Sequence, residues 1–106
     1  MAIYKNLTSA TTHDLISKNK KGGDIQKISI TNYSGSNAAT VSIFIEDAAA
    51  SESTDASNNK YYFISTLVIP VGTSFVLEDV LSFNTSIYHL RALIAGTSPL
   101  ISVIIK

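Results

Sequence analysis

The sequence predicts an all-β protein, a single antiparallel β-sandwich of roughly seven or eight short strands with jelly-roll or immunoglobulin-like topology. Apolar and polar residues alternate with a period of two in several short segments, and helical periodicity is nearly absent. Turn residues recur about every 8–12 residues, as they do in sandwiches and small barrels. The 106 residues suffice for one domain with one core, so we expect residues 1–106 to fold as a unit.

The N-terminal half contains four segments with strand character. They are residues 2–7, 14–17, 25–33 and 40–47. In the third and fourth segments, β-branched residues share one face: Ile28 and Ile30, and then Val41, Ile43 and Ile45, which are expected inside. The alternation in the last segment places Phe44 on the outside, which predicts an exposed aromatic side chain there.

The C-terminal half contains four more candidate strands, at residues 61–69, 74–77, 88–94 and 100–105. In the third of these, Leu90, Ala92 and Ile94 share one face. In the last, Ile101, Val103 and Ile105 share one face, and Leu100, Ser102 and Ile104 share the other.

The connections between these segments are rich in Gly, Pro, Ser and Asn, as turns are. Residues 1–12 are expected to form a short N-terminal arm that includes the first weak strand. Residues 48–59 are small, polar and acidic, which predicts a solvent-exposed loop. The stretch 77–83 is the one place where a helical turn is expected.

Composition excludes several classes of protein. The chain has no Cys, which excludes disulfides and thiolate metal sites. Eight Lys+Arg balance eight Asp+Glu, and charged residues are only 15%. This balance argues against nucleic-acid binding and against electrostatic attachment to membranes, and it favours contact with other proteins, including copies of the same chain. No signal peptide or apolar span is visible, so synthesis in a cytoplasm is expected.

The residue types needed for catalysis do not converge in the sequence. His13 and His89 are the two imidazoles, and no G-x-S-x-G motif accompanies them. The carboxylate pairs at 46–47 and 78–79 are adjacent on strands, so their side chains point to opposite faces. We therefore expect no catalytic residues and no enzyme activity.

Three groups of residues could form binding sites, but for each we favour an ordinary structural or solvent-exposed role. Asp47, Glu52 and Asp55 could bind calcium, but we favour a solvated loop and expect no metal or cofactor. A basic cluster could contact nucleic acid or an acidic protein, or be a solvated turn; it consists of Lys18, Lys20, Lys21 and Lys27. Tyrosines could stack on sugars, or fill the core and rim an interface; these are Tyr33, Tyr61, Tyr62 and Tyr88.

Several segments resemble small virion proteins of tailed bacteriophages, particularly phages of marine cyanobacteria. They are MAIYKNLTS (1–9), GDIQKISITN (23–32), ATVSIFIED (39–47), YYFI (61–64), VIPVGTSFVLED (68–79) and the closing ISVIIK (101–106). The resemblance covers most of the chain and implies a structural role in capsid decoration, or in the neck, tail or fibre.

Together these features predict a non-enzymatic bacteriophage structural protein, most simply a capsid decoration or accessory head, neck or tail subunit. Its partners would be copies of itself, in a symmetric homo-oligomer, and a larger capsid, neck or tail protein, so its location would be the virion. The residues expected to touch partners are Ile3, Tyr4, Leu7, Phe44, Tyr62 and Ile104. The alternative is a carbohydrate-binding, receptor-binding module of a phage fibre.

Overall fold

The computed structural model describes residues 2–17, 24–47, 60–78, 81–85 and 87–106. The strands in these parts are β1 (Ile3–Leu7), β2 (Thr12–Ile16), β3 (Asp24–Ile25), β4 (Ile28–Asn32), β5 (Ala39–Asp47), β6 (Lys60–Ile69), β7 (Ser74–Leu77), β8 (Leu81–Ser82), β9 (Tyr88–Ala95) and β10 (Ile101–Ile105). The predicted all-β fold is confirmed.

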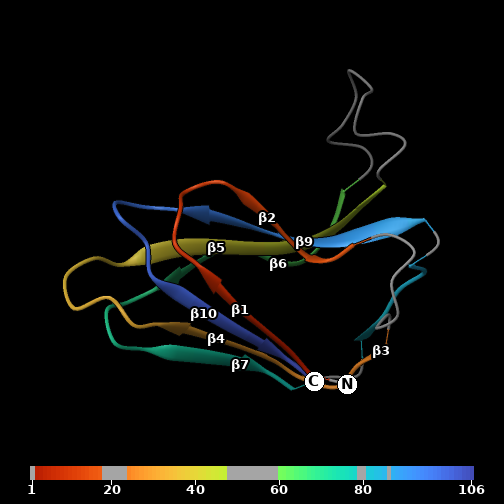
Figure 1. Ribbon diagram of the computed structural model, residues 1–106, viewed down its shortest axis with the longest axis horizontal. Coiled ribbons are helices and arrows are strands. Elements are labelled where there is room, and N and C mark those ends of the chain that lie inside the picture. Colours follow the sequence, from red (N-terminus) through yellow and green to blue (C-terminus); the bar gives the residue numbers. More distant parts are fainter. Residues whose placement is uncertain (1, 18–23, 48–59, 79–80, 86) are drawn as a thin grey trace.

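Eight of these strands form a sandwich of two four-stranded antiparallel sheets (Figure 1). Sheet 1 has the order β1-β10-β4-β7, and sheet 2 has the order β2-β9-β5-β6. The first of the eight strands pairs with the last, the second with the seventh, the third with the sixth and the fourth with the fifth. This nested pairing is the jelly-roll connectivity, and it differs from the immunoglobulin arrangement of ABED against CFG.

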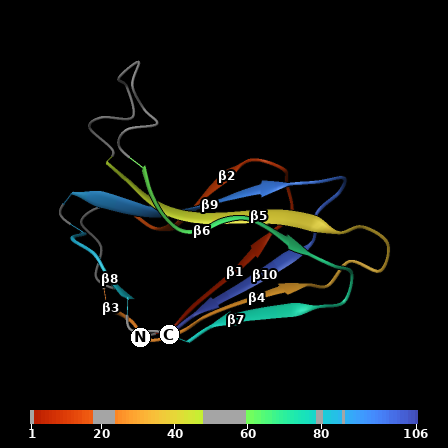
Figure 2. The same ribbon diagram turned by 180° about the vertical axis from the view of Figure 1, so that it is seen from behind.

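The connections at the two ends of the sandwich differ in kind. Four short loops at one end join the sheets: residues 8–11, 33–38, 70–73 and 96–100. At the opposite end lie both termini and the small two-stranded ribbon of β3 and β8 (Figures 1 and 2).

The core lies between the sheets and is almost purely aliphatic. Strands β4, β9 and β10 alternate as predicted, and their inward side chains are fully buried: Ile28, Ile30, Leu90, Ala92, Ile94, Ile101, Val103 and Ile105. Burying an aliphatic side chain of this size contributes roughly 1.5–3 kcal/mol. The predicted alternation is therefore confirmed for these three strands.

Strand β5 is buried on both faces, which corrects one prediction. Val41 and Ile43 face the core as expected, but Phe44, on the outer face, is only 1% exposed. The ring of Tyr62 covers it from β6, with 5.2 Å between ring centroids. A central strand is flanked on both sides, so its outward side chains are covered by long neighbours.

Within the expected N-terminal arm, the segment with weak strand character is a strand of the sandwich. Residues Ile3–Leu7 form β1, an edge strand of sheet 1 that pairs with β10 from Ile3 opposite Ile105 to Leu7 opposite Ile101. Leu7 therefore points into the core and is 3% exposed. The stretch expected to hold a helical turn instead contains the end of β7 and strand β8, with residues 79–80 outside the described part.

Strand β6 pairs with β5 through two register shifts. At the first shift, Ser65 and Thr66 together oppose Ser42, which is a β-bulge. Thr66 adopts a φ of 49°, and its N–H donates to the Ser42 hydroxyl at 2.9 Å. The hydroxyl thus satisfies a backbone donor that the bulge removes from the ladder.

Each described sheet edge carries a feature that hinders addition of another strand. Lys5 occupies an inward row of β1, β2 has a register shift after Asp14, and β6 has its two shifts. Strand β7 is only four residues long. Inward charges, bulges and short edge strands are known protections against edge-to-edge pairing. Contacts with other proteins are therefore expected on the faces or ends of the sandwich.

Candidate interaction surface

The outer face of sheet 1 bears no charged side chain over two complete rows. The register aligns Tyr4, Ile104, Ser29 and Val76 in one row, and Asn6, Ser102, Thr31 and Ser74 in the next. We call these eight residues the neutral face.

The polar row of the neutral face is already paired within the sheet. The Ser102 hydroxyl donates to Asn6 Oδ1 at 2.8 Å, and the hydroxyls of Thr31 and Ser74 lie 2.8 Å apart. These cross-strand hydrogen bonds hold the small polar groups in place, so the row is an ordered surface.

The apolar row is exposed and uneven. Tyr4 is 69% exposed and Val76 is 41% exposed, and Ile104 stands between two hollows. The hollow of about 210 Å³ has Tyr4, Asn6, Ser102 and Ile104 among its lining residues. The other, of about 110 Å³, is lined by Ser29, Ile104, Lys27 and Lys106. The half-buried Ile104 therefore has a hollow on each side.

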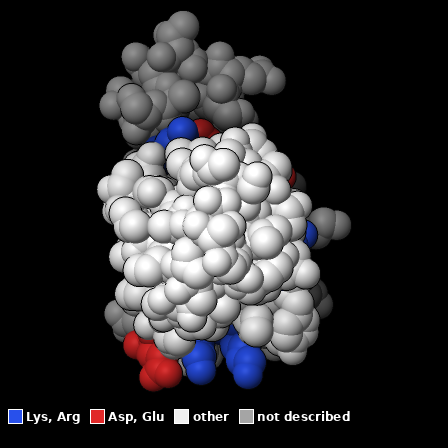
Figure 3. Space-filling model, turned by 90° about the vertical axis from the view of Figure 1, so that its left-hand side faces the viewer, with Lys and Arg blue, Asp and Glu red and all other residues white. Residues whose placement is uncertain are grey.

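The neutral face continues onto the end of the sandwich that carries the four short loops. These loops read TSAT (8–11), YSGSNA (33–38), PVGT (70–73) and GTSPL (96–100), with no charged residue among them. We call them the loop end. Viewed from this end, acidic and basic side chains appear only toward the margins of the molecule (Figure 3).

Asn32 organises the loop end from inside. Its fully buried side chain donates from Nδ2 to the carbonyls of Asn37 and Ile69, both at 2.9 Å. Its Oδ1 accepts from the backbone N–H of Ser34 at 3.0 Å. The Ser34 hydroxyl in turn accepts from the N–H groups of Ser36 and Asn37. One side chain therefore fixes loop 33–38 and ties it to the end of β6.

Backbone contacts connect the remaining loops. The Asn32 N–H donates to Thr73 O, the Tyr33 N–H to Leu100 O, and the Ile94 N–H to Thr11 O. Gly96, with a φ of 134°, lies so close to loop 33–38 that an added Cβ would sit 3.1 Å from the Ala38 carbonyl oxygen. The loop end is therefore a single interlocked unit.

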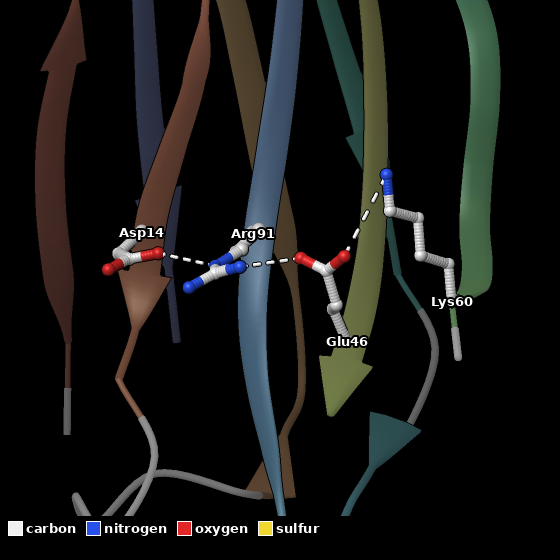
Figure 4. Close-up of polar contacts among 4 residues, drawn as sticks. All are labelled: Asp14, Glu46, Lys60 and Arg91. Carbon is white, nitrogen blue, oxygen red and sulfur yellow. Dashed lines mark hydrogen bonds and ion pairs between the residues drawn. The ribbon is translucent and has the colours of Figure 1, made fainter. Parts of the chain in front are cut away.

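The outer face of sheet 2 differs because charged side chains cross all four of its strands (Figure 4). Arg91 on β9 donates to Asp14 on β2 at 2.7 Å and to Glu46 on β5 at 2.5 Å. Lys60 on β6 lies 3.8 Å from Glu46 and 5.1 Å from the centroid of the Phe44 ring. Burial alone would lower the pKa of Arg91, but its hydrogen bonds and its attraction to Asp14 and Glu46 outweigh that effect and raise it.

The structure places the predicted contact residues in different locations, some exposed and some buried. Tyr4 and Ile104 lie side by side on the neutral face. Ile3 is half-buried at the edge of the inner face, and Tyr62 is exposed on sheet 2 beside the charged row. Leu7 and Phe44 are buried, at 3% and 1% exposure, which corrects the expected exposure of Phe44; contact of either residue with a partner stays a prediction.

Sequence reasoning missed most of the neutral face. Val76 and the small polar residues of β1, β4, β7 and β10 were not singled out as contacts. Their signal was present in the alternation itself, because the polar positions of these strands share the outer face. Which strands would lie side by side could not be read from a local pattern.

The other sequence candidates are dispersed. Tyr33 lies at the loop end, Tyr61 contacts Tyr88 edge-on at 5.9 Å, and Tyr62 stacks on Phe44, so they form no single sugar-stacking platform. His13 Nε2 bonds to the carbonyl of Ser9 at 2.9 Å. Lys27 pairs with Glu78 at 3.8 Å.

The metal interpretation concerns residues that the structure largely leaves undescribed. Glu52, Asp55 and the expected loop 48–59 lie outside the described residues, as do Lys18, Lys20 and Lys21, and the side chain of Asp47 is not described. Among the described residues, no group of three His, Cys, Asp or Glu could hold a metal ion. The described part of the chain also contains no helix long and apolar enough to span a membrane.

Comparison of the chain with protein-family models and with curated proteins gives no match.

Proposed function

We propose that the chain is a non-enzymatic structural subunit of a bacteriophage virion that acts through protein–protein contacts. The observation that carries this proposal is the absence of charged side chains from the loop end and from the two rows of the neutral face. The resemblance of the sequence to small virion proteins supplies the biological setting, and the jelly-roll architecture is compatible with it.

The loop end is suited to docking on another protein. Its residues have at most two side-chain torsions each, so little rotamer entropy is lost when a partner immobilises them. It holds no charge that a partner would have to desolvate. The Asn32 and Ser34 hydrogen bonds fix the loops before binding, which further reduces the ordering cost.

The composition of loop 33–38 supports the same function. Tyr, Ser, Gly and Asn dominate it, and these residues also dominate the binding loops that antibodies present on a rigid β-sandwich. Tyr33, at 45% exposure, provides the large aromatic contact, and the small residues around it provide polar contacts. We therefore assign the loop end to a larger capsid, neck or tail protein.

Quantitative mass spectrometry of purified particles tests this proposal. The particles would be those of the phage that encodes the chain, separated from lysate proteins on a density gradient. We expect the chain at a fixed ratio to the major capsid protein that persists through a second gradient. Absence of the chain, while the capsid protein is abundant, would overturn the virion assignment. A chain free in the lysate that binds a glycan array would favour the carbohydrate-binding alternative instead.

A further inference from the structure

Lys27, just before β4, and Lys106, just after β10, lie directly opposite each other. The Lys106 N–H donates to the Lys27 carbonyl at 2.9 Å, and the Lys27 N–H donates to the main-chain oxygen of Lys106 at 3.0 Å. Residues of antiparallel strands that exchange two backbone hydrogen bonds lie about 5.5 Å apart at Cα, with their side chains on the same face. Like charges in this arrangement are destabilising. An anion bound between the two ammonium groups would remove that repulsion.

Of these two ammonium groups, one has an acidic partner in the described part of the chain. Lys27 Nζ lies 3.8 Å from Glu78 Oε1, in an ion pair whose side chains are 41% and 73% exposed. Lys106 forms no ion pair with a described residue. The described side chains therefore leave one positive charge uncompensated here, which matches a ligand group with a single negative charge.

The two lysines border the hollow of about 110 Å³, together with Ser29 and Ile104. Ser29 and Ile104 are half-buried and lie two residues from the lysines, so all four share the outer face. The Ser29 hydroxyl has no hydrogen-bond partner among the described residues, whereas the hydroxyls of the polar row are all paired. The hollow thus offers two ammonium groups, a free hydroxyl and an aliphatic wall.

These groups suit a carboxylate carried on a short aliphatic stem. The two oxygens of a carboxylate have about four lone-pair positions, enough for donors from both ammonium groups and from the hydroxyl. The methylene groups of the stem would lie against Ile104 and leave water. The hollow is well below the roughly 300–1,000 Å³ of sites for drug-sized ligands, so it fits one acidic side chain better than a nucleotide or an oligosaccharide.

The rows next to the hollow favour a protein as the bearer of this carboxylate. Exposed ion pairs stabilise a complex only weakly, so a free carboxylate would bind poorly by itself. The neutral face adjoins the hollow and holds no charge that a covering protein would have to desolvate. An acidic side chain held in the hollow would fix the position of such a protein on these rows.

We propose that this hollow is a carboxylate subsite, occupied by an acidic side chain of a partner protein that covers the neutral face. The ammonium groups of Lys27 and Lys106 and the Ser29 hydroxyl donate to the carboxylate. Ile104 contacts its stem. The hollow lies toward the end of sheet 1 that holds the termini, away from the loop end, so this partner is a second protein (Figure 1). The inference shares with the proposed function only the assignment of protein partners, and its test needs no particles.

Titration of the purified chain, followed by NMR, tests the subsite. The probe is glutamate with its amino and α-carboxyl groups blocked, so that the side chain carries its only charge. Blocked glutamine is the matched neutral probe, and sodium chloride keeps the ionic strength constant. We expect blocked glutamate to shift the amide signals of Ser29 and Ile104 saturably, with a Kd of roughly 10–100 mM. Blocked glutamine is expected to give no saturable shift.

Substitution of single lysines separates this hollow from general attraction to positive charge. Lys27→Gln and Lys106→Gln are each expected to weaken binding of blocked glutamate by about three-fold or more, because each removes a charge and its donors. Lys106→Arg keeps the charge and is expected to stay within about two-fold. Lys5→Gln is the matched control, since Lys5 belongs to the same sheet and borders the other hollow; it is also expected to stay within about two-fold. Thermal unfolding of each variant verifies that it is folded.

A short peptide tests whether the bearer of the carboxylate is a protein that covers the neutral face. The peptide is acetylated and amidated, with valine on each side of one glutamate and serine at each end. We expect it to bind about five-fold or more tightly than blocked glutamate, because its added residues reach the neutral face. Tyr4→Ser should remove this gain and leave the binding of blocked glutamate unchanged. A peptide that binds no more tightly than blocked glutamate would contradict a protein partner on these rows.

Three other results would overturn the carboxylate subsite. Equal shifts with blocked glutamine would show that the hollow does not recognise charge. Equal losses in Lys5→Gln and Lys106→Gln would show that binding does not depend on this hollow. Inorganic phosphate that binds more tightly than blocked glutamate would indicate a general anion site with no preference for an acidic side chain.

Discussion

Tyr4 and Ile104, which stand near opposite ends of the sequence, are direct neighbours on the outer face of sheet 1. Their contact follows from the nested jelly-roll pairing, in which the first strand lies against the last. The same pairing brings together small polar residues from four strands and yields two adjacent rows without charge on that outer face. The other outer face is crossed by Asp14, Arg91, Glu46 and Lys60.

Asn32→Ala is expected to destabilise the fold by about 2–4 kcal/mol. The substitution leaves the carbonyls of Asn37 and Ile69 and the N–H of Ser34 without their buried partner. Urea unfolding measures the change. Asn6→Ala is the matched control, because it removes one exposed hydrogen bond to Ser102 and should cost less than about 1 kcal/mol. Equal effects would show that Asn32 does not organise the loop end.

Arg91→Met is expected to cost about 2–3 kcal/mol in the same assay. The Glu46 side chain is only 8% exposed. Without Arg91, the one described ion pair left to its carboxylate is the more distant one with Lys60. Adding Glu46→Gln to Arg91→Met should recover part of the loss, since the buried charge is then removed. Asp14→Asn should cost less than about 1 kcal/mol, because Asp14 is half exposed. No recovery in the double variant would contradict this account.

The contribution of the Arg91 charge should be independent of pH over the range in which proteins are normally studied. Its pKa is raised in the folded chain. A raised folded pKa gives stability that is complete below the unfolded pKa and is lost only as the pH rises through the folded value. Both values are strongly alkaline for arginine. The difference in unfolding free energy between Arg91→Met and the original chain should therefore be the same at about pH 7 and about pH 9.

Gly96→Ala is expected to destabilise by about 1–3 kcal/mol. The φ of 134° is one that L side chains rarely adopt, and the new Cβ would press on the Ala38 carbonyl at 3.1 Å. Gly35→Ala is the matched control: it meets nothing within 4 Å and should change stability by no more than about 0.5 kcal/mol. Two equal melting temperatures would argue against a close approach of the loops at Gly96.

The sequence predicts the fold class and the aliphatic core correctly because these depend on local alternation. Residues 28–32, 88–95 and 101–105 each bury one side of an alternating pattern. Strand β1 is harder to predict, because Lys5 interrupts its inward row and makes the segment look like an exposed arm. The two bulges of β6 break the period of two, so no regular face could be read from residues 60–69.

The candidate surface could be predicted only in part. Tyr4 and Ile104 stand out as apolar residues on outward positions, whereas Val76 and the small polar residues gain meaning only from their register. Phe44 shows the converse case. The alternation places it correctly on the outer face, but its burial depends on Tyr62 and Lys60 from the neighbouring strand β6. Long-range packing of this kind leaves no local signature.

The most direct test of the central claim is binding of the purified chain to particles assembled without it, measured by co-sedimentation. Ser36→Lys places one charge on an exposed position of the loop end, and Gln26→Lys places the same charge at the opposite end. We expect saturable binding that Ser36→Lys weakens at least ten-fold and that Gln26→Lys leaves within about two-fold. No saturable binding, or equal losses in both variants, would contradict docking through the uncharged loop end.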